Sequence, residues 1–168
     1  MPASRNHSFE DALRADGPAP ESAGKLALYG RFVGDWTLDA TMHEADGSVR
    51  HGTGEVHFAW VLQGRAIQDV WTVWDVFYGT TLRVYDPKLD AWRILWNDPV
   101  LQIFARQIGR ADGDEILQEG ASEDGVPLRW RFSEITARSF RWRGERSDDG
   151  GKTWWLQHEY RATRAEGG

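Results

Sequence analysis

The stretch YGRFVGDWTL, residues 29–38, decides the fold of this chain. Just before it, Leu28 and Phe32 are spaced one helical turn apart, whereas beyond it apolar residues recur at every second position. At its centre, Gly34-Asp35-Trp36 places a glycine, which allows an abrupt entry into a strand, two residues before a large aromatic side chain that needs to be buried. We therefore expect a short helix over residues 21–32, followed by an all-β domain.

The rest of the chain is typical of about ten short strands joined by turns. Asp46-Gly47 and Asp86-Pro87-Lys88 are turn sequences between neighbouring alternating segments. The connections are too short for helical crossovers, so the strands must pair antiparallel, and closure would remove exposed sheet edges. The sequence predicts a closed antiparallel up-and-down barrel. The expected strands cover residues 36–42, 49–60, 65–73, 78–85, 91–97, 101–108, 115–121, 127–135, 140–147 and 153–163.

Length and composition limit the class of protein. The 168 residues suit one domain, which we place at residues 21–164, between a flexible lead-in at 1–20 and a short tail at 165–168. The absence of cysteine excludes disulfides and thiolate metal sites. The net charge of -6 argues against a nucleic-acid partner. No apolar run resembles a secretory signal or a membrane span, so we expect a cytoplasmic protein that does not bind membranes.

Ten tryptophans are too many for a small solid core but are easily placed around a cavity. A closed barrel of about ten strands is wide enough to hold a small ligand. We therefore expect a small apolar or aromatic partner. The predicted walls are Trp71, Trp96, Phe104, Trp130 and Trp142, with His158 and Asp69 as polar groups. Ile103 and Ala105 remain alternatives to Phe104 on the inward face.

Asp69 has two open interpretations. If it shares the inward face with Ile67 and Trp71, it is a buried carboxylate that needs a partner such as Arg93 or a tyrosine. If the strand faces the other way, Ala66, Gln68 and Val70 lie inside instead.

The sequence resembles the calycin superfamily, which includes lipocalins, fatty-acid-binding proteins and nitrobindin-like barrels. More closely, it resembles uncharacterised bacterial lipocalin-like proteins, over about residues 26–164. This resemblance implies a lipocalin-like barrel with the helix capping one end. The motifs that carry it are Phe32-Val33-Gly34-Asp35-Trp36, Trp60-Val61-Leu62-Gln63-Gly64-Arg65-Ala66, Tyr78-Gly79, Tyr85-Asp86-Pro87 and Ser147-Asp148-Asp149-Gly150-Gly151-Lys152-Thr153-Trp154.

The resemblance also implies roles for two residues of the last strand. In lipocalins an arginine near the end of that strand covers the Gly-x-Trp tryptophan, and we assign this role to Arg164 over Trp36, with Arg161 as the alternative. In nitrobindin-like barrels a histidine near the C-terminus binds haem, and His158 lies in a comparable place.

Three functions follow as hypotheses. The first is a binding protein for a small apolar or aromatic molecule, with no cofactor, no metal and no catalytic residue assigned. The second is an enzyme on the same barrel, either a haem-dependent isomerase or an isomerase or decarboxylase that uses His158 or Asp69. The third is a structural module whose barrel is filled by its own side chains. The sequence contains no Ser-His-Asp set, phosphate loop or paired carboxylates, and it leaves homodimer formation open.

Overall fold

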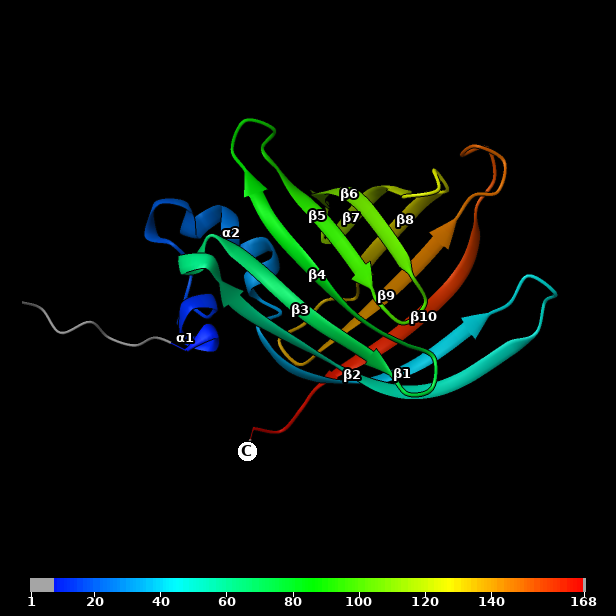
Figure 1. Ribbon diagram of the computed structural model, residues 1–168, viewed down its shortest axis with the longest axis horizontal. Coiled ribbons are helices and arrows are strands. Elements are labelled where there is room, and N and C mark those ends of the chain that lie inside the picture. The colour runs from blue at the N-terminus through cyan, green and yellow to red at the C-terminus, as the bar shows by residue number, and fades with distance from the viewer. Residues whose placement is uncertain (1–7, 168) are drawn as a thin grey trace, which may run out of the picture.

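A computed structural model describes residues 8–167. Ten antiparallel strands form a closed barrel in which each strand pairs with its neighbours in sequence, and the first pairs with the last (Figure 1). The predicted up-and-down barrel is confirmed. The strands are β1 (Gly34–His43), β2 (Val49–Val61), β3 (Ala66–Val73), β4 (Phe77–Asp86), β5 (Ala91–Asp98), β6 (Ile103–Asp112), β7 (Glu115–Ser122), β8 (Pro127–Ser133), β9 (Ser139–Arg146) and β10 (Trp155–Arg164).

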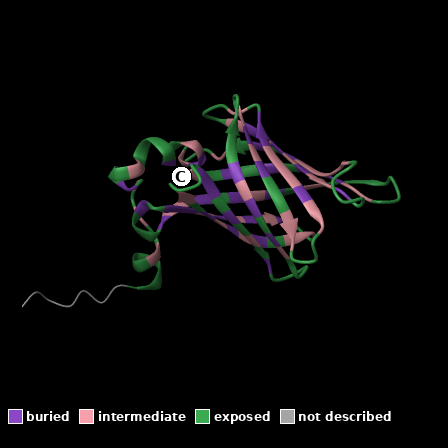
Figure 2. Ribbon diagram, turned by 90° about the horizontal axis from the view of Figure 1, so that it is seen from above, coloured by how far each residue is buried: buried purple, intermediate pink, exposed green. Residues whose placement is uncertain are grey.

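The alternation of apolar and polar residues becomes an alternation of burial along each strand (Figure 2). In β8 and β9, Phe132 and Phe140 point inward, while Arg129 and Arg141 point outward and pair with glutamates on adjacent strands. Because side chains on a strand alternate between its two faces, this pattern fixes which residues can reach the barrel interior.

The helices all lie at one end of the barrel (Figure 1). In α2, Leu26 and Tyr29 are fully buried, and Tyr29 packs edge-on against Trp92 with ring centroids 4.9 Å apart. This end is therefore closed by α2, as the sequence predicts, and the opposite end is formed only by turns between strands. The helical elements are α1 (Phe9–Leu13), η1 (Pro20–Ser22), α2 (Ala23–Gly30) and η2 (Leu62–Gly64).

The described part of segment 1–20 is attached to the barrel. Ser8 and Asp11 form a reciprocal capping box at the start of α1. The backbone N–H of Ala15 donates to the carbonyl of Trp60, and that of Ala19 donates to the carbonyl of Gly64, both at 2.9 Å. The first seven residues of the lead-in that the sequence predicts to be flexible lie outside the described range.

Trp36 and Arg164 meet at the helical end. They are paired across β1 and β10, and the guanidinium carbon lies 4.1 Å from the centroid of the Trp36 ring. The guanidinium also donates to three backbone carbonyls, those of Arg31, Val33 and Ala137, at 2.8–3.0 Å. Arg164 thus ties β10 to the segment that precedes β1 and to the loop between β8 and β9.

The same arginine explains Gly34. Gly34 has a φ of +130°, which side chains disfavour, and a Cβ at this position would lie 2.6 Å from the Nη1 atom of Arg164. The glycine therefore allows both the entry into β1 and the approach of the guanidinium.

Arg164→Ala should lower the free energy of unfolding by about 2 kcal/mol, because a cation–π contact and hydrogen bonds from a charged donor are lost together. Urea denaturation of the purified variant measures this. Arg161→Ala is the control, because Arg161 is three residues away, on the exposed face, and makes only surface ion pairs. Equal losses in the two variants would contradict the role assigned to Arg164.

Candidate ligand-binding site

A cavity of about 130 Å³ opens at the end of the barrel away from the helices. That is many times the roughly 10–15 Å³ that a single water needs when volume is measured in this way. The turns between β3 and β4 and between β5 and β6 border it, together with the nearby parts of β8, β9 and β10. Its aromatic lining consists of Trp71, Phe77, Trp96, Trp130, Trp142 and Tyr160.

Five of these side chains are arranged in a closed circle in which each contacts the next, and we call them the aromatic cluster. It is built from five different strands, and two of its contacts are edge-to-face while one is a parallel stack. Trp71 packs against it from β3. The ring-centroid distances are 5.9 Å for Phe77–Trp96, 6.2 Å for Trp96–Trp130, 5.5 Å for Trp130–Trp142, 5.0 Å for Trp142–Tyr160 and 6.0 Å for Tyr160–Phe77.

Glycines make room for two of the indoles. A Cβ at Gly79, on the strand next to that of Trp96, would lie 2.5 Å from the Trp96 ring, and a Cβ at Gly144, on the same strand as Trp142, would lie 2.6 Å from the Trp142 ring. The Trp96 indole therefore lies across a neighbouring strand where that strand has no side chain, and the Trp142 indole lies along its own strand over Gly144. The sequence contains this information only as two isolated glycines, so the analysis of patterns does not reveal it.

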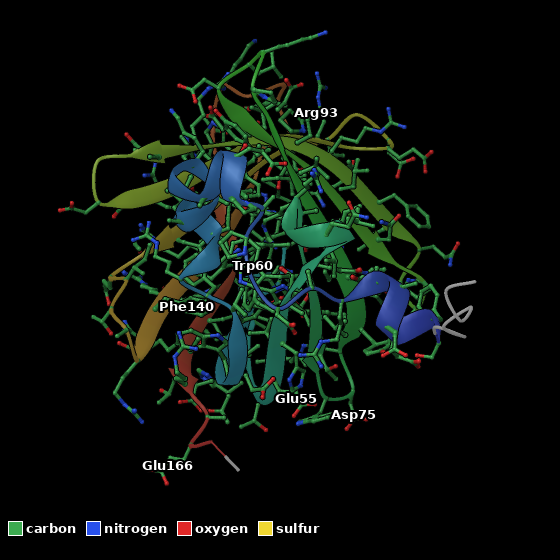
Figure 3. The ribbon with its side chains drawn as sticks, turned by 90° about the vertical axis from the view of Figure 1, so that its left-hand side faces the viewer. Glu55, Trp60, Asp75, Arg93, Phe140 and Glu166 are labelled. Atoms are coloured by element: carbon green, nitrogen blue, oxygen red, sulfur yellow. The ribbon has the colours of Figure 1, made fainter. Side chains whose placement is uncertain are left out.

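Asp69 points inward but does not line the cavity. Its side chain is fully buried and forms an ion pair with Arg83, and it accepts a hydrogen bond of 2.9 Å from the backbone N–H of Thr81. The prediction of Arg93 as its partner is wrong, because Arg93 lies on the outside of the barrel, where it pairs with Asp86 (Figure 3). Arg83, which alternation places on the inward face of β4, forms part of the cavity floor instead.

A buried polar layer lies beneath the cavity. Gln118 accepts hydrogen bonds from the Tyr29 hydroxyl at 2.9 Å and from Arg83 Nε at 3.3 Å, and its own amide donates to Gln107 at 3.2 Å. Burial raises the pKa of Tyr29 well above its ordinary value, so its hydroxyl stays protonated. This layer separates the open cavity from the aromatic core under α2.

His158 lines the cavity from β10. Its ring lies beside Tyr160 and Phe77, with centroid distances of 6.0 and 6.5 Å. Its Nδ1 atom is buried and has no hydrogen-bond partner among the described residues. Burial lowers the pKa of His158 to about 4, so the imidazole is neutral near pH 7.

Asp98, at the end of β5, is a cavity residue that the sequence analysis missed. Its side chain is only 1% exposed, and its Oδ1 atom accepts hydrogen bonds of 2.8 Å from the backbone N–H groups of Val100 and Leu101. Its other oxygen, Oδ2, has no partner among the described residues, and no described cation lies within ion-pair distance. The inward parity of Trp92, Ile94 and Trp96 would have placed it inside, but Asp before Pro is also a common turn sequence.

Phe104 does not line the cavity, and this prediction is wrong. Ala105 and Gln107 are buried inside β6, so the alternation of the strand turns Phe104 outward. It borders a separate depression on the outer surface with Leu95 and Arg106, while Ile103 lies at the cavity mouth. The predicted residues that meet at the cavity are Trp71, Trp96, Trp130, Trp142 and His158.

In residues 8–167, no three histidine, cysteine or acidic side chains come together in a way that could hold a metal ion. Within the same range, no helix has the length and apolar character needed to cross a membrane.

No family model and no curated protein matches the chain. Among solved structures it is similar to an S-type phycobiliprotein lyase, CPES, from Guillardia theta, at 14% identity and a TM-score of 0.61, over 84% of this chain and 93% of the other. It is also similar to Rv2717c from M. tuberculosis, at 15% identity and a TM-score of 0.64, over 89% and 99% of the two chains. These likenesses show the fold alone, a closed antiparallel up-and-down barrel.

Proposed function

We propose that this protein binds a small apolar or aromatic molecule in the cavity at the open end of the barrel. The aromatic cluster is the observation that carries the proposal. Five large side chains border the cavity there, whereas Tyr29, Phe32 and Phe132 at the helical end are fully buried in the core. Ligand sites are typically concave, largely apolar and supplied with a few polar groups, here His158 and the floor around Arg83.

The structural neighbours support binding in a barrel at a coarse level. One of them is by its printed name a phycobiliprotein lyase, which supports a small pigment-like molecule as the ligand of this barrel. Such a molecule would stack on the tryptophan faces that border the cavity.

A pair of adjacent variants tests the proposal. Ile103→Trp adds bulk at the cavity mouth, whereas Phe104→Trp adds it on the outer face of the same strand. We expect Ile103→Trp to weaken the binding of a neutral probe such as tert-butylbenzene at least about tenfold by filling the site, and Phe104→Trp to leave it unchanged. Isothermal titration calorimetry measures both. Wild-type protein that shows no binding would argue for the self-filled barrel, and equal binding by the two variants would show that the probe binds outside this cavity.

The surroundings of His158 do not fit haem ligation. A histidine that binds a metal almost always donates its second ring N–H to an acceptor, and Nδ1 of His158 has none among the described residues. A Soret band in haem-reconstituted protein that disappears in His158→Ala would overturn this interpretation.

The enzyme hypothesis that uses Asp69 as a base is not favoured. Its carboxylate is engaged by Arg83 and by the Thr81 N–H, and it lies below the cavity floor rather than in the cavity wall. A general base must come within hydrogen-bond reach of its substrate, which this position does not allow.

A further inference from the structure

We infer that the ligand is an organic cation, a quaternary or protonated amine whose charged group is surrounded by the aromatic cluster and lies beside Asp98. This inference rests on the proposed function and specifies the chemical class of the ligand. It combines two independent features of the cavity, the closed arrangement of aromatic side chains and a single uncompensated carboxylate.

The first feature is the aromatic cluster itself. The face of an aromatic side chain carries partial negative charge, so several faces around one space attract a cation, most strongly when the side chains are tryptophans. Here three tryptophans, a tyrosine and a phenylalanine surround the cavity in continuous contact. This geometry resembles the cages that recognise quaternary ammonium groups.

The second feature is the charge balance of the lining. The positive charge of Arg83 is compensated by Asp69 directly beneath it, and His158 is neutral because its pKa is lowered. Asp98 is the one charged lining residue, among those the structure describes, that forms no ion pair. The cavity therefore has a net negative character and contains no free cation that would repel a positively charged ligand.

Asp98 also has a structural role, but that role uses only one of its oxygens. Oδ1 accepts the N–H groups of Val100 and Leu101 and thereby holds the turn after β5, whereas Oδ2 makes no bond to a described residue. Oδ2 is thus available to a ligand, and a bound cation would compensate the charge of this carboxylate. An asparagine could still accept both turn hydrogen bonds, so the turn alone does not require a charge.

Two isosteric probes test the inference. Phenyltrimethylammonium and tert-butylbenzene have nearly the same shape and differ in the charge of one central atom. We expect calorimetry to show that the cation binds wild-type protein on the order of tenfold more tightly than the neutral probe. In Asp98→Asn we expect this preference to be lost while the neutral probe binds as in the wild type.

Asp75→Asn is the matched control, because Asp75 is an exposed acidic residue in the turn between β3 and β4 and does not line the cavity. It removes the same charge from a neighbouring turn and should keep the preference for the cation. A wild type that binds both probes equally, or prefers the neutral one, would refute the cation inference and leave the proposed function intact. Binding of neither probe would refute both. A preference that survives in Asp98→Asn would remove Asp98 from the site.

Discussion

Arg83→Met is expected to lower the free energy of unfolding by about 3–5 kcal/mol, because it leaves the buried carboxylate of Asp69 without its partner. The side chains of Arg83 and Asp69 are 1% and 0% exposed, so water cannot replace the lost ion pair. The methionine keeps much of the volume of the arginine, and the loss therefore reports mainly on charge rather than on an empty space. Guanidinium chloride denaturation, followed by tryptophan fluorescence, measures it.

Arg83 contributes more than one interaction to the interior. Its guanidinium lies 5.1 Å from the Tyr29 ring centroid and 5.7 Å from that of Phe132, and its Nε donates to Gln118. It therefore joins the cavity floor to the core beneath α2. Loss of Arg83 should loosen both halves of the barrel, which hydrogen exchange of the α2 amides can detect.

Two further variants separate charge from packing. In the double variant Asp69→Leu/Arg83→Met neither charge of the pair remains, so we expect it to recover a substantial part of the stability that Arg83→Met loses. Arg93→Ala breaks the exposed pair with Asp86 and should cost only about 0–1 kcal/mol. A double variant no more stable than Arg83→Met alone would show that packing of the guanidinium, and not the unpaired carboxylate, causes the loss.

The barrel and its strands could be predicted because alternation along a strand is a local property of the sequence. The resemblance to lipocalins implied an arginine over Trp36, and antiparallel pairing of the first and last strands selected Arg164, because it brings the end of one strand beside the start of the other. Trp142 could be assigned to the interior by alternation, because Phe140 lies two residues away on the same face. The face of β3 that carries Trp71 stayed open between two interpretations, because Trp71 shares it with both Val73 and the charged Asp69.

The partners of buried polar residues could not be predicted in this way. Arg83 reaches Asp69 across the β3–β4 pair, and Asp98 faces the cavity because β5 continues one residue further than its apolar pattern indicates. Phe104 was misplaced because its aromatic character was given more weight than its position in the alternation of β6. The turn before β6 contains Gln102 with a positive φ, so the alternation of β5 does not continue into β6. Local patterns define faces, whereas contacts between strands depend on register.

His158 should make the protein less stable as the pH falls from about 6.5 to about 4. Its pKa is about 4 in the folded state because of burial, compared with 6.5 for an exposed histidine, so in this range the unfolded chain takes up a proton that the folded protein does not. Proton uptake by the unfolded state lowers the free energy of unfolding, by about 3 kcal/mol in total, and the loss is complete below pH 4.

The contribution of His158 is isolated by comparison with His158→Phe, because carboxylates and His57, whose pKa Asp35 raises, also titrate as the pH changes. The difference in unfolding free energy between wild type and His158→Phe should shift by about 3 kcal/mol between pH 7.5 and pH 4, in favour of the variant at low pH. His51→Gln, which changes an exposed histidine, should show no such shift. A constant difference between wild type and His158→Phe across the whole range would mean that the imidazole is hydrated in the cavity and carries its proton there as it does in water.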